Sequence, residues 1–389
     1  MLTTSFPRIK EGEYAGPFIL NLCKELVKQG LDVTVLAPHH PNTKKHEVWD
    51  DVKIHRFQYF WPARLQKLCY GSGIPSNLTN SMLAKIQLPL FLFLLFIYSL
   101  KHSRSCDLIH CHWALSGLVG VVVKKITRKP VLVTLHGSDV LFLGKNKILD
   151  SLMEFIFSQL DLIVCVSHSL KEKAGKYVSD DSKINVIPNG VDLSAFNVKQ
   201  DFNLKGRILF IGRLVEIKGV RRLPSIIKRI NREKPEIRFE LIGSGFLEDW
   251  LRSEIKKNGL GDNVLFSGEL SSDEIPTRLI ESDLLIIPSD YEGFGMTVLE
   301  SFSTGTPVVG FSIGGLRDTV SDGVDGFLIE PFNEREFAEK SVFILENKQL
   351  RKKMGLVGRK KTEQKYSISS MAEKTKKFYH TLNRDCRGG

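Results

Sequence analysis

Two glutamates frame a glycine-rich turn in the stretch SDYEGFGMTVLESFSTGTPVV, residues 289–309. Glu292 precedes the turn, a helical pattern begins at about Met296, and Glu300 lies within that pattern. The first turn of a helix presents free backbone N–H groups and a positive dipole end, which bind anions. Carboxylates accept hydrogen bonds from paired hydroxyl groups. The stretch predicts a site for an anionic, hydroxyl-rich ligand, although both acids could instead simply stabilise the helix start.

Two cations follow an apolar strand pattern in the stretch FIGRLVEIKGV. Arg213 and Lys218 come directly after the strand, with Gly219 behind them. Arginine offers a planar fork of donors and lysine a point charge, and together they suit a diphosphate. The alternative is an ordinary solvated loop whose charges are incidental.

A histidine ends another apolar run, VTLHGSDV. His136 stands at the carboxyl end of the predicted strand, where open α/β sheets bind ligands. It could equally be a structural residue. Nearby, His110 and His112 have no third ligand at metal spacing, so we expect no metal site.

The loop GSGFLEDWL resembles part of a dinucleotide-binding loop through Gly243 and Gly245. Glu248 stands where the third glycine of that fingerprint belongs, so the signal is weak. A dinucleotide-dependent oxidoreductase is therefore the least favoured interpretation of the chain.

Two series of buried strands alternating with helices must position these residues. Continuous apolar strands between amphipathic helices are typical of parallel sheets covered on both faces. We expect two doubly wound α/β domains facing a central cleft: residues 1–193, completed by a C-terminal helix at 368–389, and residues 194–367. The predicted strands are LDVTVLAP, CDLIHCHW, PVLVTLHG, LDLIVCVS and INVIPNG, then GRILFIG, IRFELIGSG, NVLFSG, DLLIIPS and PVVGF.

The combination of these motifs resembles the retaining nucleotide-sugar glycosyltransferases of family 4. The likeness rests on EGFGMTVLESFSTGTPVVGFSIGGLRDTVSDGVDGFLIEP together with IGRLVEIKG and VIPNGVD. It implies the two-domain GT-B fold and transfer of a hexose from a nucleoside-diphosphate sugar. One departure is the start of the chain, where only Met1 and Leu2 precede TTSFPR, so the first strand is very short or begins upstream.

The resemblance also implies roles for individual residues. Arg213 and Lys218 match diphosphate contacts, Glu292 a sugar-hydroxyl contact, and Glu300 the ribose contact. His136 matches a histidine beside the sugar, and it joins Arg213, Lys218 and Glu292 as the catalytic set. The backbone around the helix start and a glycine after the first strand complete the donor site: Gly16, Gly293, Phe294, Gly295, Met296 and Thr297.

Charge and composition limit the partners. The net charge is +11. Residues 1–200 carry 24 Lys and Arg against 16 Asp and Glu, so most of the excess lies in the first half. No nucleic-acid motif accompanies it, and we expect none to bind. An anionic membrane surface is the alternative partner, because this half holds the aromatic, basic stretch HRFQYFWPARLQKLCYG and the apolar run LPLFLFLLFIYSL.

We expect a cytoplasmic enzyme that touches the inner face of the cell membrane. The apolar run Leu88–Leu100 is shorter than the roughly 20 residues of a spanning helix, so it predicts no crossing. It could also be a helix buried against the sheet. No signal peptide is apparent, and the six cysteines are expected to be buried free thiols.

The sequence thus predicts a metal-independent, retaining transfer to a hydroxyl of a lipid-linked or polysaccharide acceptor. No cofactor other than the nucleotide sugar is expected. The main alternative is a non-catalytic nucleotide-sugar-binding partner protein of the same fold. Retention of both cations and both glutamates argues against it.

Overall fold

The computed structural model describes residues 1–385 except 11, 13–15, 72 and 142. The chain forms two compact units. One consists of Met1–Gly190 together with Ile368–Gly389, and the other of Val191–Ser367. We call them the N-terminal unit and the C-terminal unit and describe each by itself.

The N-terminal unit contains an eight-stranded sheet of order β3-β4-β2-β1-β5-β6-β7-β8. All neighbours pair in parallel except β3 and β4, which form an antiparallel edge. The first strand is only two residues long, yet it lies between β2 and β5. The strands are β1 Leu2–Thr3, β2 Thr34–Pro38, β3 His46–Trp49, β4 Val52–Phe57, β5 Ile109–His112, β6 Val131–Leu135, β7 Leu162–Cys165 and β8 Ile184–Val186.

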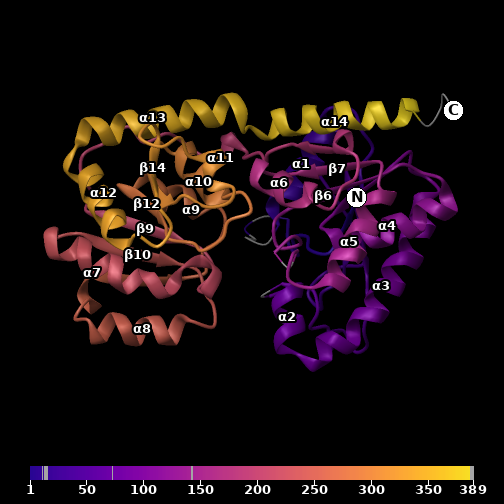
Figure 1. Cartoon of the computed structure of the whole chain (residues 1–389), viewed down its shortest axis with the longest axis horizontal. Coiled ribbons are helices and arrows are strands. Elements are labelled where there is room, and N and C mark those ends of the chain that lie inside the picture. Colours follow the sequence, from indigo (N-terminus) through magenta and orange to yellow (C-terminus); the bar gives the residue numbers. More distant parts are fainter. Residues whose placement is uncertain (11, 13–15, 72, 142, 386–389) are drawn as a thin grey trace. The chain divides into compact units, whose positions relative to one another are not determined.

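Helices cover both faces of this sheet (Figure 1). On one face α1 packs against α14, and Leu132 of β6 belongs to the core that they share. On the other face α3, α4 and α5 pack side by side, and Gly117 and Gly120 of α4 approach Val131 and Val133. The helices are α1 Pro17–Lys28, α2 Ile74–Asn80, α3 Met82–Ser103, α4 Ala114–Thr127, α5 Lys147–Gln159, α6 His168–Gly175 and α14 Ile368–Asp385.

The last helix belongs to the N-terminal unit although it follows the C-terminal unit in sequence. Met371, Ala372 and Tyr379 of α14 are buried in the core that α1 and the sheet form. The Tyr379 hydroxyl lies 2.6 Å from His110 Nδ1 on β5.

The C-terminal unit holds a six-stranded parallel sheet of order β11-β10-β9-β12-β13-β14. Its strands are β9 Arg207–Ile211, β10 Arg238–Ile242, β11 Val264–Gly268, β12 Leu284–Ile287, β13 Val308–Phe311 and β14 Gly326–Ile329. Its helices are α7 Leu223–Glu233, α8 Glu248–Lys257, α9 Ile275–Ile280, α10 Met296–Ser303, α11 Leu316–Thr319, α12 Glu334–Glu346 and α13 Lys348–Lys365. The two-sheet α/β architecture predicted from the strand patterns is confirmed.

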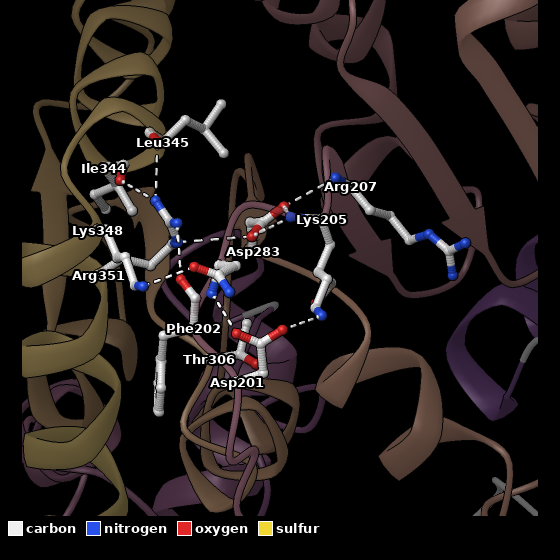
Figure 2. Close-up of polar contacts among 12 residues, drawn as sticks. Asp201, Phe202, Lys205, Arg207, Asp283, Thr306, Ile344, Leu345, Lys348 and Arg351 are labelled. Carbon is white, nitrogen blue, oxygen red and sulfur yellow. Dashed lines mark hydrogen bonds and ion pairs between the residues drawn. The ribbon is translucent and has the colours of Figure 1, made fainter.

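A buried polar network holds the amino edge of this second sheet (Figure 2). Asp283, directly before β12, accepts hydrogen bonds from the backbone N–H groups of Lys205 and Arg207, at 2.9 and 3.0 Å. Its carboxylate also pairs with the guanidinium of Arg351 from α13 at 3.6 Å. Arg351 in turn donates to the carbonyl oxygens of Ile344, Leu345 and Phe202. Two adjacent strands and a helix are therefore tied together through fully buried charges.

Two expectations for the first half need correction. The apolar run is part of α3, which has 22 residues, so its length does not argue against a membrane crossing. Within the described residues α3 is long and apolar enough to span a bilayer, with a mean hydropathy of 1.9 over 18 residues. Only 28% of that window is buried, which also contradicts a helix enclosed against the sheet.

The aromatic, basic stretch differs from its predicted interfacial character as well. Phe57 and Tyr59 are fully buried and pack against Phe91 of α3. Of the large aromatic side chains there, Trp61 is the one that is mainly exposed, at 61%. The stretch therefore buries most of its aromatic side chains and does not present them at the surface.

Candidate active site

Loops at the carboxyl ends of four adjacent strands interlock in the C-terminal unit. The loop after β9 and the loop after β12 meet where the backbone N–H groups of Asp290 and Tyr291 donate to the carbonyl of Ile217. The loop after β10 joins them, since the Leu214 N–H donates to the Ser244 carbonyl at 2.7 Å. Such an edge is where parallel sheets bind ligands.

Two predicted site residues meet at this edge. Lys218 forms an ion pair with Glu292, 74 residues further along the chain. The Ser289 hydroxyl donates to the same Glu292 oxygen at 3.1 Å. Glu292 is largely buried, whereas the Lys218 side chain is one quarter exposed. The lysine therefore reaches from the buried carboxylate toward solvent, and Ser289 is a partner that the sequence did not indicate.

Arg213 lies on the same loop as Lys218 and has an exposed side chain. Its carbonyl accepts the Val215 N–H at 2.9 Å, which keeps the start of the loop tightly turned. The arginine is thus presented on the surface of the loop that also carries Lys218.

Glycines make the close contact of these loops possible. Gly219 has a φ of 67°, and a Cβ there would lie 1.7 Å from the Pro288 carbonyl oxygen. Gly314 and Gly315, after β13, clamp the other side of the Glu292 loop. A Cβ on Gly314 would lie 2.1 Å from the Glu292 carbonyl oxygen, which accepts the Gly315 N–H at 2.9 Å. The clamp was missed because the pair GG carries no chemistry of its own.

Helix α10 begins directly at this loop. Gly295 is its N-cap in a left-handed conformation, with a φ of 92°, and none of the described side chains caps the helix. Gly293 precedes the cap, and Met296 and Thr297 form the first turn. The Phe294 side chain is buried and packs against Tyr366. Residues 293–297 therefore offer mainly backbone groups, and the uncapped helix start favours an anion.

Glu300 lies in the second turn of α10. Its Oε2 atom is buried and has no hydrogen-bond partner among the described residues. Burial raises the pKa of this carboxyl from 4.5 to about 7. Buried polar atoms in folded proteins are nearly always paired, so this carboxyl oxygen is free to accept a hydrogen bond from a ligand.

The weak dinucleotide signal has a structural explanation. Only glycine fits at positions 243 and 245. A Cβ on Gly243 would lie 2.0 Å from the Gly212 carbonyl oxygen, and a Cβ on Gly245 would lie 2.3 Å from the Leu214 carbonyl oxygen. These glycines allow the loops after β9 and β10 to touch. Their spacing therefore serves packing and gives no support to a dinucleotide site.

His136 lies at the carboxyl end of β6 in the N-terminal unit. Its Nε2 atom is 3.0 Å from Nδ1 of His112, so one ring donates to the other. Burial lowers the pKa of His136 to about 3, and the ring is neutral. His136 Nδ1 and His112 Nε2 are buried without a partner in the described part of the chain. The pair therefore has an unused donor and an unused acceptor.

Helix α1, which follows Gly16, contacts this histidine. Gly16 is the N-cap of α1 with a φ of 77°, and Phe18, two residues later, packs on His136 with ring centroids 4.9 Å apart. The residues before it, 13–15, lie outside the described part of the chain. Among described residues no group of three or more His, Cys, Asp or Glu could hold a metal ion.

Two family models together match almost the whole chain. Residues 196–361 match Glycosyl transferases group 1, and residues 15–195 match Glycosyltransferase Family 4. An uncharacterized glycosyltransferase of Methanocaldococcus jannaschii is 34% identical over 283 residues, which cover 72% of this chain and 77% of the relative. This chain belongs to family 4 of the glycosyltransferases. It is an enzyme of a retaining family, with the GT-B fold.

More distant relatives of the glycosyltransferase differ in substrate. The N-acetyl-alpha-D-glucosaminyl L-malate synthase of Bacillus anthracis is 24% identical, over 74% of this chain and 77% of its own length. Sucrose-phosphate synthase from Thermosynechococcus elongatus superposes with a TM-score of 0.82 at 23% identity, covering 98% of both chains. Anabaena HepE, solved with UDP-glucose, gives a TM-score of 0.73 at 18% identity, again covering 98% of both chains. These structures show the fold.

Proposed function

We propose that this glycosyltransferase moves a hexose from a nucleoside-diphosphate sugar to a hydroxyl of a lipid-linked or polysaccharide acceptor. The observation that carries the donor side is the orphaned Glu300 carboxylate on the helix whose uncapped start adjoins the Lys218–Glu292 pair. A carboxylate that accepts hydrogen bonds from hydroxyls and an anion site on one short helix match the ribose and the diphosphate of a nucleotide sugar.

Each group has a distinct role in this proposal. Glu300 accepts hydrogen bonds from the ribose hydroxyls, and Glu292 accepts a hydrogen bond from a hydroxyl of the sugar. Lys218 has three N–H donors, so it can maintain its ion pair with Glu292 while it donates a hydrogen bond to a phosphate oxygen. Arg213 and the N–H groups at the start of α10 share the remaining phosphate charge.

The reaction breaks the bond between the anomeric carbon and the diphosphate oxygen. Arg213, Lys218 and the start of α10 stabilise the charge that develops on the leaving group. The acceptor hydroxyl attacks from the face that the diphosphate leaves, and its proton passes to a departing phosphate oxygen. Configuration is thereby retained without an enzyme nucleophile or a metal.

His136 contributes as a neutral hydrogen-bonding group. Because burial holds its pKa near 3, it does not supply a positive charge at physiological pH. Its unpartnered Nδ1 accepts from or donates to a sugar hydroxyl, and His112 sets which by fixing the tautomer. Gly16 brings the start of α1 beside it.

The first experiment is thermal unfolding of the purified enzyme with UDP, GDP and ADP. HepE was solved with UDP-glucose, so we propose UDP as the preferred nucleotide. A ligand that binds only the folded state raises its apparent stability. Stabilisation by none of the three would contradict the donor site. Stabilisation without release of nucleotide from any UDP-sugar, with or without acceptor, would favour a non-catalytic binding protein.

The acceptor is proposed from charge and surface character. A cytoplasmic enzyme whose basic half contacts the inner membrane face would meet lipid-linked acceptors there. Transfer to membrane extracts but not to soluble sugars is the expected result. Equal transfer to free sugars would assign a soluble acceptor instead.

A further inference from the structure

An exposed apolar stripe runs along α3. Its side chains recur at spacings of four, seven and four residues, which places them on one face of the helix. Met82 is 71% exposed, Ile86 64%, Phe93 59% and Ile97 41%. This is unusual, because soluble proteins rarely expose large contiguous apolar patches without a function.

The opposite face of α3 is anchored in the N-terminal unit. Phe91 and Leu95 are fully buried. Gln87 is buried as well, and its amide donates to the Leu65 carbonyl and accepts from the Lys67 N–H, at 2.6 and 2.9 Å. Spanning a bilayer would break these contacts and carry the side-chain amide into hydrocarbon, which is costly. The helix is therefore built to lie along a surface and not to cross it.

Neighbouring helices extend the stripe into a face. Val122 and Ile126 are exposed on α4, and Ile148, Leu152 and Phe155 are exposed on α5. Lys125 of α4 lies 5.1 Å from the ring centroid of Phe155, which joins the two helices on the same side. Helix α3 packs against α4 and α4 against α5 (Figure 1). We therefore treat the exposed apolar side chains of the three helices together and call them the α3–α5 face.

The charges around the α3–α5 face favour an anionic partner. On two of its three helices, every charged side chain is basic. Helices α3 and α4 contain lysines and no acidic residue. Lys85, Lys101 and Lys125 are exposed, as is Arg128 at the end of α4. Asp150 and Glu154 on α5 are the acids of the face. Lysine is depleted at protein–protein interfaces, whereas lysine around apolar side chains is typical of helices that bind anionic lipid.

We propose that the α3–α5 face docks on an anionic membrane, with α3 lying in the plane of the headgroups. The apolar stripes enter the headgroup boundary, and the lysines contact anionic lipid. This deepens the proposed function, since it rests on the membrane acceptor proposed above. The docking can nevertheless be measured without any substrate.

Vesicle sedimentation tests the proposal with the full chain and no nucleotide. We expect binding to vesicles of phosphatidylcholine with phosphatidylglycerol at low salt, much weaker binding at high salt, and little binding to phosphatidylcholine alone. Alkaline carbonate should release the protein, because an interfacial helix is not embedded. Failure to bind anionic vesicles at low salt, or resistance to carbonate, would overturn the proposal.

A matched pair of variants locates the face. The double substitution Ile86→Glu with Phe93→Glu should lower partitioning to anionic vesicles by about 10-fold or more, because two apolar groups are replaced by charges that the lipid repels. Phe343→Glu, on α12 of the C-terminal unit and 48% exposed, should leave partitioning unchanged. Urea unfolding of each variant checks that it is folded.

Other outcomes would assign the face differently. If the double variant binds vesicles like the wild type, the α3–α5 face is not the docking surface. If the wild type forms a dimer that the double variant lacks, the occupant is a second copy of this chain. Donor binding and nucleotide release without vesicles are measured in parallel. If the wild type shows neither donor binding nor nucleotide release, the proposed function is wrong. If it shows both but does not bind vesicles, only the docking proposal is wrong.

Discussion

The two edges of the sheet in the C-terminal unit treat buried charge in opposite ways. At the amino edge, Asp283 and Arg351 are both buried, and their polar groups are paired with backbone groups and with each other (Figure 2). At the carboxyl edge, Glu300 keeps a buried oxygen without a partner among described residues. At the amino edge, which we call the complete edge, the buried charges have partners. At the carboxyl edge, which we call the incomplete edge, a buried carboxyl oxygen has none among the described residues.

The difference separates structural charge from functional charge. A satisfied buried network holds one arrangement of the strands and makes a partly satisfied one costly. The Lys218–Glu292 pair is intermediate, since one partner is buried and the other reaches solvent. We infer that the paired network holds the strands in place at their amino ends. The sheet can therefore tolerate unpaired buried groups at the carboxyl ends of the strands.

The largest effect is expected from breaking the complete edge. Asp283→Asn leaves Arg351 buried without its counter-charge and should lower the free energy of unfolding by about 3–5 kcal/mol. The control, Asp201→Asn, removes an exposed pair with Lys205 and should change stability much less, because solvent screens such pairs. Urea unfolding measures both. Similar losses in the two variants would mean that burial of Asp283 does not matter.

Breaking the incomplete edge should instead cost activity. Lys218→Ala and Arg213→Ala should each lower turnover by about 10² or more, because each removes charge stabilisation of the leaving diphosphate. Lys257→Ala, which removes an exposed pair with Glu254 on α8, is the control and should keep full turnover. Steady-state kcat and KM for the donor are the measurement. Near-normal turnover of both site variants would exclude a diphosphate role.

The two glutamates of the site should separate by ligand. Glu300→Gln should weaken binding of both UDP and a UDP-sugar by about 10-fold, the loss of a hydrogen bond to a charged group. Glu292→Gln should weaken only the UDP-sugar, because the free nucleotide lacks the hexose. Calorimetric titration of each variant with each ligand gives four affinities. If both variants lose both ligands equally, the two roles are not distinct.

Glu300 should also make stability depend on pH. Its folded-state pKa of about 7 lies above the ordinary 4.5, so protonation favours the folded state. That contribution is complete below about pH 4.5 and is lost as the pH rises through about 7. The Glu300→Gln variant should therefore gain stability relative to the wild type between pH 5 and 7.5. A pH-independent difference between the two proteins would show that Glu300 does not titrate there.

The smallest expected effect is that of metal removal. Cationic side chains and the start of α10 already face the proposed diphosphate position, so treatment with EDTA should leave transfer activity nearly unchanged. Activity assays before and after chelation, followed by addition of Mg²⁺ or Mn²⁺, provide the test. Loss of activity that Mn²⁺ restores would show that a metal ion, and not Arg213 and Lys218, neutralises the diphosphate.

Local patterns in the sequence predicted much of this architecture. Continuous apolar runs marked ten strands of the two sheets, and the motif loops at 212–219 and 289–296 lie at adjacent strand ends as parallel-sheet geometry requires. The antiparallel edge was missed. Its strand β3, HEVW, is short and mostly exposed, so it carries little apolar signal.

Contacts between distant segments could not be predicted. The Lys218–Glu292 pair and the clamp of Gly314 on the Glu292 carbonyl join loops that only the folded sheet brings together. The length of α3 was underestimated because Gln87 seemed to end the apolar run. In the structure Gln87 is a buried residue of α3 whose side chain hydrogen-bonds to the backbone of Leu65 and Lys67, and Ser81 caps the helix six residues earlier.

The placement of α14 has a consequence for how the chain is made. A ribosome synthesises the N-terminal unit first, and domains usually fold as they emerge. Here Ala372 and Tyr379 fill the core beneath α1, so the N-terminal unit lacks part of its interior until α14 has been translated. The C-terminal unit, by contrast, is one continuous segment that ends at Ser367. The later half of this enzyme should therefore reach its native state before the earlier half does.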